Sequence, residues 1–277
     1  MASFTNFATL SYNGGTTNSN IVTGEILEAL TAVKTAVSAN YSAGDRITYA
    51  LSLVNTGTAA ITDYTVTDNL GGYTVGANTV YPLAYNAGTV RYYINGVLQT
   101  APTVTAGPPL TVTGLTVPAG GSAVLIYETT ATPVAPLATG SSITNTATIT
   151  GGGLTNPITA QATVETATSA DLSISKALSP MTVTENGQIT YTFVISNTGN
   201  TEATATSNVV VTDTFAPILR NIAVTYNGTA WTEGTNYTYN AATGVFTTLA
   251  GQITVPAATF TQNTDGTFSV TPGTATL

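Results

Sequence analysis

The residues of this sequence that could do chemistry are lysines, aspartates and asparagines that recur in short, similar motifs. They are Lys34 in LTAVK, Lys176 in LSISK, Asp68 and Asp213 at the ends of two Val-Thr-Asp runs, Asn145 in ITNTATI, and Asn6 in FTNFATL. The chain has no other lysine. The motifs alternate apolar and polar residues, so we expect them to be strands whose successive side chains point to opposite faces.

Strand alternation places each of these polar residues on the apolar face of its motif. The sets that share a face are Leu30, Ala32 and Lys34; Leu172, Ile174 and Lys176; Val66 and Asp68; Val211 and Asp213; Ile143, Asn145, Ala147 and Ile149; and Phe4, Asn6, Ala8 and Leu10. We therefore predict that a lysine, an aspartate and an asparagine point into the core of each half of the chain.

A buried lysine must be ion-paired, neutral or chemically consumed, because an unpaired buried ammonium costs several kcal/mol. One interpretation is a structural Asp–Lys ion pair capped by the asparagine. The other, which we favour, is an isopeptide bond: the neutral lysine amine attacks the asparagine carboxamide, and a protonated aspartate polarises the carbonyl and passes a proton to the departing ammonia. Asp68 and Asp213 are then the catalytic proton shuttles, acting on Lys34 with Asn145 and on Lys176 with Asn6.

The elements that must position these residues form a repeated unit. ITYALSLVNTG, residues 47–57, recurs as ITYTFVISNTG, residues 189–199, with the lysine strand at the same distance upstream in both copies. The apolar spacing of residues 25–37 could be helical, but LSISK is a poor helix, so the repeat favours strands in both copies. Short strands with regular turn signals predict an all-β fold of two tandem immunoglobulin-like β-sandwich domains.

The two copies differ at their ends. We assign 25–166 to the first β-sandwich domain and 167–277 to a second that lacks its last strand, because the second copy has no counterpart of ITNTATI. The remaining copy of that strand is FTNFATL, so 1–24 is interpreted as an N-terminal donor strand followed by a flexible linker, residues 11–24, rich in Asn, Gly and Thr.

Composition excludes several classes of function. Charged residues make up 6% of the chain, the formal net charge is −8 and there are five Lys and Arg, which disfavours nucleic-acid and anionic-membrane partners. With no Cys and no His, thiolate nucleophiles, Ser–His–Asp catalysis and the usual metal centres are excluded. We expect no cofactor, no metal, no enzyme activity beyond autocatalysis, no membrane span and no signal peptide.

The inward lysine strand, ITYxxxxxNTG, Val-Thr-Asp and ITNTATI together resemble the bacterial domain-of-unknown-function-11 repeat, an immunoglobulin-like module of surface and fibre proteins. This family resembles isopeptide-forming pilin and adhesin domains, and by position Lys34, Asp68 and Asn145 match that triad, as do Lys176 and Asp213. The chain is also similar to the major structural proteins of clostridial spore appendages. That similarity implies a protein made without a leader and released by lysis of the mother cell.

The leading hypothesis is a self-assembling subunit of an extracellular, spore-associated fibre. A sandwich that lacks a strand can be completed by a strand from another chain. The N-terminal donor strand of one subunit would enter domain two of the next, giving a head-to-tail homopolymer with an intradomain bond Lys34–Asn145 and an intersubunit bond Lys176–Asn6. An anchoring protein at the spore or cell surface is the expected second partner.

Two rivals stay open. In one, residues 4–10 fold back onto their own molecule, and the protein is a monomeric surface stalk or adhesin. In the other, the Thr-rich strands or the loops that carry Tyr92 and Trp231 bind glycans or ice.

Overall fold

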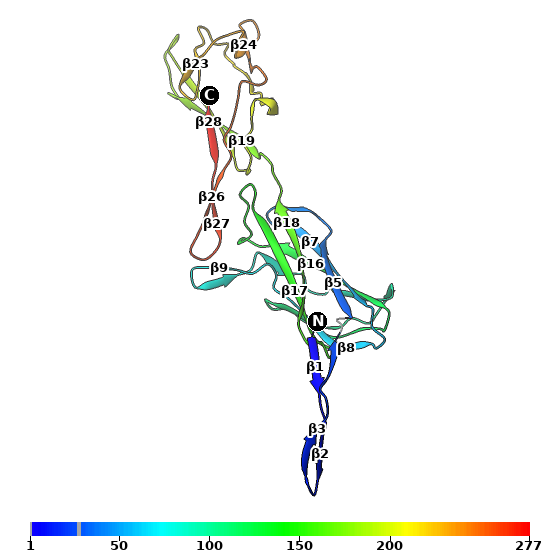
Figure 1. The fold of residues 1–277 in the computed structure, drawn as a ribbon. Helices are drawn as coiled ribbons and strands as arrows, with labels where there is room; N and C mark the ends of the chain where they lie inside the picture. Colours follow the sequence, from blue (N-terminus) through cyan, green and yellow to red (C-terminus); the bar gives the residue numbers. More distant parts are fainter. Residues whose placement is uncertain (1, 27–28) are drawn as a thin grey trace. The chain divides into compact units, whose positions relative to one another are not determined.

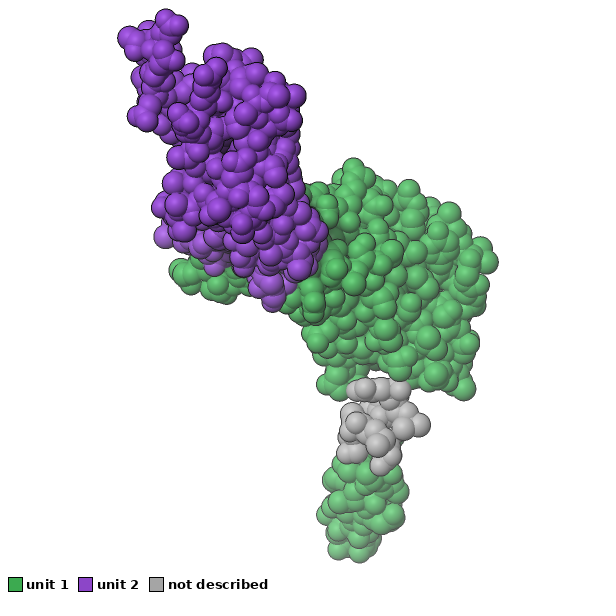
Figure 2. Space-filling view, turned by 90° about the horizontal axis from the view of Figure 1, so that it is seen from above, with its two compact units in different colours: residues 1–135, 142–165 green, residues 136–141, 166–277 purple. Residues whose placement is uncertain are grey.

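The computed structural model describes residues 2–26 and 29–277, which form two compact units. Unit 1 comprises residues 1–135 and 142–165, and unit 2 comprises residues 136–141 and 166–277 (Figures 1 and 2). Apart from one 3-10 turn, η1 (Ala205–Ser207), the regular elements of the described ranges are strands. No helix in these ranges is long and apolar enough to cross a membrane.

Unit 1 is a sandwich of two mixed-length antiparallel sheets. The first sheet has the order β13-β12-β16-β7-β5, with β11 also paired to β16, and its strands are β5 (Leu30–Ala36), β7 (Arg46–Asn55), β11 (Leu83–Tyr85), β12 (Arg91–Ile94), β13 (Val97–Leu98) and β16 (Ser122–Ala131). The second has the order β14-β15-β8-β17-β18-β6, with β6 (Asn40–Tyr41), β8 (Ile61–Asp68), β14 (Thr103–Thr105), β15 (Leu110–Val117), β17 (Ser142–Gly151) and β18 (Ile158–Thr166). A small hairpin joins β9 (Tyr73–Val75) to β10 (Asn78–Val80).

The core of unit 1 lies between these sheets and follows the period-two pattern of the sequence. Along β7, Ile47, Tyr49, Leu51 and Leu53 are each fully buried, while the residues between them are more exposed. On the facing sheet, Ile143, Ala147 and Ile149 of β17 are buried, with threonines on the other face. β-branched and aromatic residues suit such half-buried strands, so local preference and burial agree here.

Residues 30–36 form β5 rather than a helix, as the internal repeat predicts. Its burial alternates along LTAVKTA, and it pairs antiparallel with β7 over its whole length, with Lys34 opposite Leu51. Leu30 and Lys34 thereby face the core, and Val33 lies on the outer face at 59% exposure.

The N-terminal residues form a two-stranded ribbon that precedes β5. In it, β1 (Ala2–Asn6) pairs with β4 (Val22–Ile26), and β2 (Thr9–Tyr12) pairs with β3 (Gly15–Asn18). We call this ribbon the N-terminal hairpin; it is dark blue in Figure 1. The sequence predicted a flexible linker for residues 11–24. The structure instead places residues 11–12 in β2 and residues 15–18 and 22–24 in the return arm, with a tight turn at Asn13-Gly14.

Unit 2 is built of smaller sheets. One has the order β19-β20-β28, with β19 (Leu172–Ser179), β20 (Thr190–Asn197) and β28 (Gly273–Thr276). Another has the order β21-β25-β24, with β21 (Thr212–Thr214), β24 (Tyr237–Asn240) and β25 (Val245–Thr248). Two further hairpins pair β22 (Val224–Tyr226) with β23 (Thr229–Trp231) and β26 (Thr259–Gln262) with β27 (Phe268–Thr271). Its core includes Phe193, Ile195, Val211, Phe215 and Phe246.

The two units share their opening elements. Both β5–β7 and β19–β20 are antiparallel pairs, with Lys34 opposite Leu51 and Lys176 opposite Phe193. Both also keep the asparagine of the NTG motif buried: the Asn55 amide donates to the carbonyls of Ala59 and Pro118, and the Asn197 amide donates to those of Thr201 and Pro256. The repeat in the sequence is therefore a repeat in structure.

Candidate functional site

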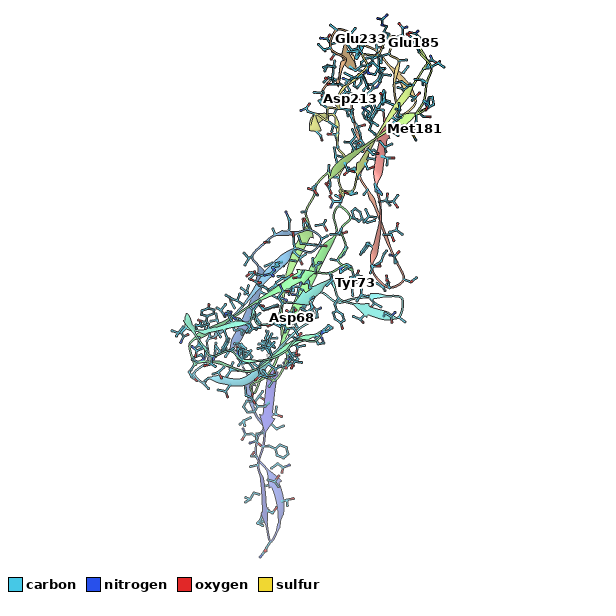
Figure 3. The ribbon with its side chains drawn as sticks, turned by 180° about the vertical axis from the view of Figure 1, so that it is seen from behind. Asp68, Tyr73, Met181, Glu185, Asp213 and Glu233 are labelled. Carbon is cyan, nitrogen blue, oxygen red and sulfur yellow. The ribbon has the colours of Figure 1, made fainter. Side chains whose placement is uncertain are left out.

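The candidate site of unit 1 lies between its two sheets, where three strands bring together the predicted triad. Lys34 comes from β5 of one sheet, and Asp68 and Asn145 come from β8 and β17 of the other. These strands are neighbours because β17 pairs with β8 in a register that sets Ala147 opposite Asp68. Lys34, Asp68 and Asn145 are 4%, 1% and 0% exposed, so water is excluded from all three. Figure 3 shows Asp68 among the side chains of this unit.

The Asp68 carboxylate receives three donors. Lys34 Nζ lies 2.5 Å from its Oδ2, and the Tyr127 hydroxyl donates to the same oxygen. The backbone N–H of Leu70 donates to Oδ1 at 2.9 Å. A charge in a protein core is tolerated when it is ion-paired and hydrogen-bonded. The three donors also fix the orientation of the carboxylate toward the amine.

Burial makes the Lys34 amine easier to deprotonate. Desolvation disfavours the ammonium and lowers the pKa of Lys34 to about 8, even though the Asp68 charge and hydrogen bond act in the opposite direction. The ammonium position also lies 4.8 Å from the centroid of the Tyr49 ring and 5.9 Å from that of Tyr127. Burial therefore favours the neutral, nucleophilic form of the amine relative to an exposed lysine.

The Asn145 carboxamide is the least satisfied group of the site. Among the described residues neither its Oδ1 nor its Nδ2 has a hydrogen-bond partner, although the residue is fully buried. The carboxamide nevertheless lies near the two tyrosine hydroxyls: burial and Asp68 raise the pKa of Tyr49 and Tyr127, and the neighbouring Asn145 amide partly offsets that rise. A buried amide without partners costs about 1–3 kcal/mol and calls for a chemical explanation.

Unit 2 repeats two of the three residues. Lys176 of β19 forms an ion pair with Asp213 of β21 and lies 4.6 Å from the centroid of the Tyr191 ring. The Lys176 side chain is 41% exposed and that of Asp213 is 18% exposed, in contrast to the closed pair of unit 1. No hydrogen bond in the described ranges joins Asn6 to either residue. The structure therefore brings this lysine and aspartate together within unit 2, whereas Asn6, the partner that the sequence predicts, belongs to unit 1.

The exposure of Lys176 belongs to a wider uncovered face. Leu172 and Ile174, which share its side of β19, are 37% and 55% exposed, whereas their counterpart Leu30 in unit 1 is 3% exposed. In unit 1 the second sheet continues past β8 into β17 and β18, while in unit 2 β21 pairs with β25 and no described strand lies on its other edge. The uncovered face and the unpaired edge therefore occur together in the unit where no described strand takes the place of β17 beside β21.

The predicted donor residues lie in the N-terminal hairpin. Phe4 and Leu10 are 56% and 64% exposed, and Asn6 and Ala8 are exposed as well. Phe4 lies opposite Gly24 and Asn6 opposite Val22. Apolar side chains on a two-stranded ribbon this exposed indicate a surface that is built to be covered.

Two residues of the unit 1 site were not singled out in the sequence. Tyr127 and Tyr49 are fully buried, stack with ring centroids 5.8 Å apart, and frame the Lys34 amine. The signal was present, because alternation in AVLIYETT places Tyr127 on the same face as Leu125, but a tyrosine on an apolar face is most often packing.

Of the two aromatic residues considered for glycan binding, Tyr92 is buried and Trp231 is half-buried. The Tyr92 hydroxyl bonds with the carbonyl and N–H of Thr116. Trp231 stacks on Tyr226 with ring centroids 4.9 Å apart. Among the described residues, no group of three or more acidic side chains could hold a metal ion.

Comparison with known proteins gives fold-level similarity. No family model matches the chain, and no curated protein matches it. It is similar to the major pilin subunit of Bacillus cereus (14% identity, TM-score 0.37, 98% of this chain and 74% of that one) and to the pilus backbone protein of Streptococcus pneumoniae (15%, 0.35, 44% and 31%). It is also similar to a C-terminal fragment of the major pilin of Streptococcus agalactiae (14%, 0.36, 52% and 58%). The chain thus spans less than two thirds of both streptococcal structures. Apart from η1, the regular elements of both units are β-strands.

Proposed function

We propose that the protein is a structural subunit that polymerises head to tail into an extracellular fibre. The observation that carries the proposal is the contrast between equivalent positions. Leu30 and Lys34 are buried in a unit whose second sheet continues past β8 into β17 and β18, whereas Leu172, Ile174 and Lys176 are more exposed in a unit whose β21 has no described strand on its other edge. Such an edge accepts a strand from another chain, with backbone hydrogen bonds for affinity and alternate side chains for register.

The donor in this proposal is residues 4–10 of a second copy. FTNFATL matches ITNTATI of β17, so Asn6 takes the place of Asn145, and Phe4 and Leu10 take the places of Ile143 and Ile149. Donor and acceptor are different surfaces of the same chain. The contact is therefore heterologous and propagates into an open filament.

Isopeptide bonds would lock the fibre. In unit 1, Lys34 Nζ attacks Asn145 Cγ, the new C–N bond forms, the Cγ–Nδ2 bond breaks, and ammonia leaves with a proton that Asp68 passes on from the lysine. The support is the arrangement itself: an amine with a lowered pKa 2.5 Å from a buried carboxylate, and a buried carboxamide without hydrogen-bond partners. Lys176, Asp213 and Asn6 of the next subunit would react in the same way.

A spore surface is the location we propose for the fibre, with an anchoring protein at its base. This rests on the resemblance of the lysine, NTG, Val-Thr-Asp and TNTA motifs to repeats of surface and appendage proteins. Localisation of the protein by immunogold labelling on spores and vegetative cells would test it.

Denaturing gel electrophoresis tests the assembly and the bonds together. The purified protein, boiled in detergent, should give a ladder of oligomers. Intact mass should show the loss of one ammonia for each bond. Asn6→Ala should abolish the ladder and leave the loss of one ammonia from unit 1. Asn145→Ala should keep the ladder and abolish the loss of ammonia from unit 1. A wild-type protein that runs as a single monomer band and elutes as a monomer would contradict the proposed function.

A further inference from the structure

The N-terminal hairpin resembles the paired strands β17 and β18 of unit 1, and not β17 alone. In unit 1, β17 and β18 form an antiparallel pair in which Ile143 lies opposite Val164 and Asn145 opposite Ala162. In the hairpin, Phe4 lies opposite Gly24 and Asn6 opposite Val22. FTNFATL therefore corresponds to ITNTATI, and the strand paired with FTNFATL corresponds to β18. Sequence similarity alone does not reveal this second correspondence.

The sizes of the paired side chains support this correspondence. A Cβ atom at Gly24 would collide with the Phe4 ring, so the large residue on one strand requires the small one opposite. Unit 1 fills the equivalent positions with two residues of intermediate size, Ile143 and Val164, both buried. A large–small pair and two medium residues occupy a similar volume, which is the kind of exchange that close-packed cores tolerate.

The order of elements along the chain is also the same. The β17–β18 pair completes unit 1 and then leads into β19, since β18 ends at Thr166 and β19 begins at Leu172. The N-terminal hairpin leads into β5 in the same way, since β4 ends at Ile26 and β5 begins at Leu30. Each unit is thus preceded by a hairpin, and within the described ranges unit 1 is also followed by one.

Unit 2 offers places for both strands of a hairpin. In unit 1, β18 pairs on its outer side with β6, and the Glu165 N–H donates to the Ala39 carbonyl at 2.9 Å. By the constant spacing of the repeat, Ala39 corresponds to Met181, which is 90% exposed (labelled in Figure 3), and nearby Val183 is 44% exposed. A single donor strand beside β21 would leave this second edge uncovered.

We propose that the whole N-terminal hairpin of one copy, and not one strand, is the element that completes unit 2 of the next copy. This rests on the proposed function and specifies its interface: β1 and β2 occupy the position of β17 against β21, and β3 and β4 occupy the position of β18 against residues 181–183. The hairpin strands are already paired with each other, and the outer edge of β1 and β2 is open to β21. Insertion of a preformed hairpin orders less chain than insertion of a flexible strand. Each subunit contact of the filament then repeats the order of elements found along the chain, a completing hairpin followed by the lysine strand.

Intermolecular disulfides test both strands separately, because the chain has no cysteine of its own. In unit 1, Thr148 of β17 pairs with Thr67 of β8. The equivalent residues are Thr9 in the hairpin of one copy and Thr212 in β21 of the next copy, so the proposal pairs these two. The Glu165–Ala39 contact corresponds to Glu25 against Met181. Two full-length chains, differently tagged and each carrying Asn6→Ala to remove the intersubunit isopeptide bond, are mixed and oxidised. One mixture pairs Thr9→Cys with Thr212→Cys, and the other pairs Glu25→Cys with Met181→Cys.

The proposal predicts a reducible hetero-dimer in both mixtures. A dimer only from Thr9→Cys with Thr212→Cys would overturn the two-strand interface and leave the proposed function standing. No dimer from either mixture would contradict both. If a single chain carrying both Glu25→Cys and Met181→Cys gave only a monomeric disulfide, the hairpin would close its own molecule and both proposals would fall.

The matched control is Glu25→Cys with Thr238→Cys. Thr238 lies on β24, at the edge of its sheet opposite β21, and is exposed. This mixture should give no dimer above background. A dimer as abundant as that with Met181→Cys would reflect random collisions and would overturn the assigned interface.

Discussion

Lys34 Nζ lies 2.5 Å from Asp68 Oδ2 in a core where the two side chains are 0% and 1% exposed. The ion pair and the reactive pair, a neutral amine with a protonated carboxyl group, contain the same single proton. They are two arrangements of one protonation state, so both disappear when the Lys34 amine loses this proton to solvent. This relationship determines how the proposed bond formation should depend on pH.

The rate of bond formation in unit 1 should be nearly constant from about neutral pH up to about 8 and fall above it, by about tenfold per unit, as the shared proton is lost. Chains recovered unfolded in urea before reaction would be diluted into buffers of different pH, and the loss of ammonia followed by intact mass. Asp68→Asn, the control, should not react. A rate that instead climbs through pH 8 would mean that a free amine is the sole requirement and that Asp68 is not the proton donor.

Stability of the unbonded protein should rise with pH over a defined window. Asn145→Ala prevents the bond and keeps Lys34, whose pKa is lowered from 10.5 to about 8 by burial. Between these values the unfolded chain binds more protons than the folded one, so the free energy of unfolding increases with pH, by up to about 1.4 kcal/mol per unit. Above about 10 the trend should reverse, because Tyr49 and Tyr127 keep their protons in the fold after the unfolded chain has lost them.

Urea denaturation across this range measures the effect. The control adds Lys34→Met and Asp68→Asn to Asn145→Ala, which removes the titrating pair and should flatten the rise below pH 10. Equal slopes in the two proteins would show that Lys34 does not titrate abnormally in the fold.

The isopeptide bond itself should stabilise unit 1. Closing a loop on the order of 100 residues restricts the unfolded chain by about 4–5 kcal/mol in the loop-entropy treatment of cross-links. Wild type should therefore unfold at higher urea concentration than Asn145→Ala at the same pH, with cooperative loss of the β-sheet circular dichroism signal. Equal midpoints, with the ammonia loss present in wild type, would contradict this estimate.

Much of the fold was predictable because the chain repeats itself. Apolar alternation and the shared NTG and Val-Thr-Asp motifs were enough to place Lys34, Asp68 and Asn145 on inward faces, and the structure brings the first two into contact. The return arm of the N-terminal hairpin was not predictable, because its Asn-, Gly- and Thr-rich composition is the same in a flexible linker and in an exposed strand. Tyr127 was missed for a related reason: a tyrosine among apolar residues does not reveal which group its hydroxyl reaches.

Tyr127 should slow bond formation while it stabilises the ion pair. Its hydroxyl donates to the same Asp68 oxygen as Lys34, and such a bond favours the charged carboxylate over the protonated form that the reaction needs. Tyr127→Phe should therefore react faster than wild type at neutral pH. In the Asn145→Ala background the same change should lower stability by about 1.5–3 kcal/mol, as expected for a hydrogen bond to a charged group.

Tyr49→Phe is the matched control, because the Tyr49 hydroxyl, unlike that of Tyr127, makes no hydrogen bond to Asp68. It should change the rate less than Tyr127→Phe. If Tyr127→Phe abolished the reaction and Tyr49→Phe did not, Tyr127 would be required to position Asp68, and the expected direction would be wrong.

A charge on the uncovered face of unit 2 should block assembly without unfolding the subunit. Ile174 is 55% exposed in the single chain, so Ile174→Lys costs little folding energy, but a buried lysine there in the filament would lack a partner. Fibres seen by electron microscopy and the detergent-resistant ladder should both be lost, while the thermal unfolding midpoint of unit 1 stays close to that of wild type. Val33→Lys, which adds the same charge to an outward position of β5 that is 59% exposed, should assemble normally. Normal fibres from Ile174→Lys would show that this face is not where subunits join.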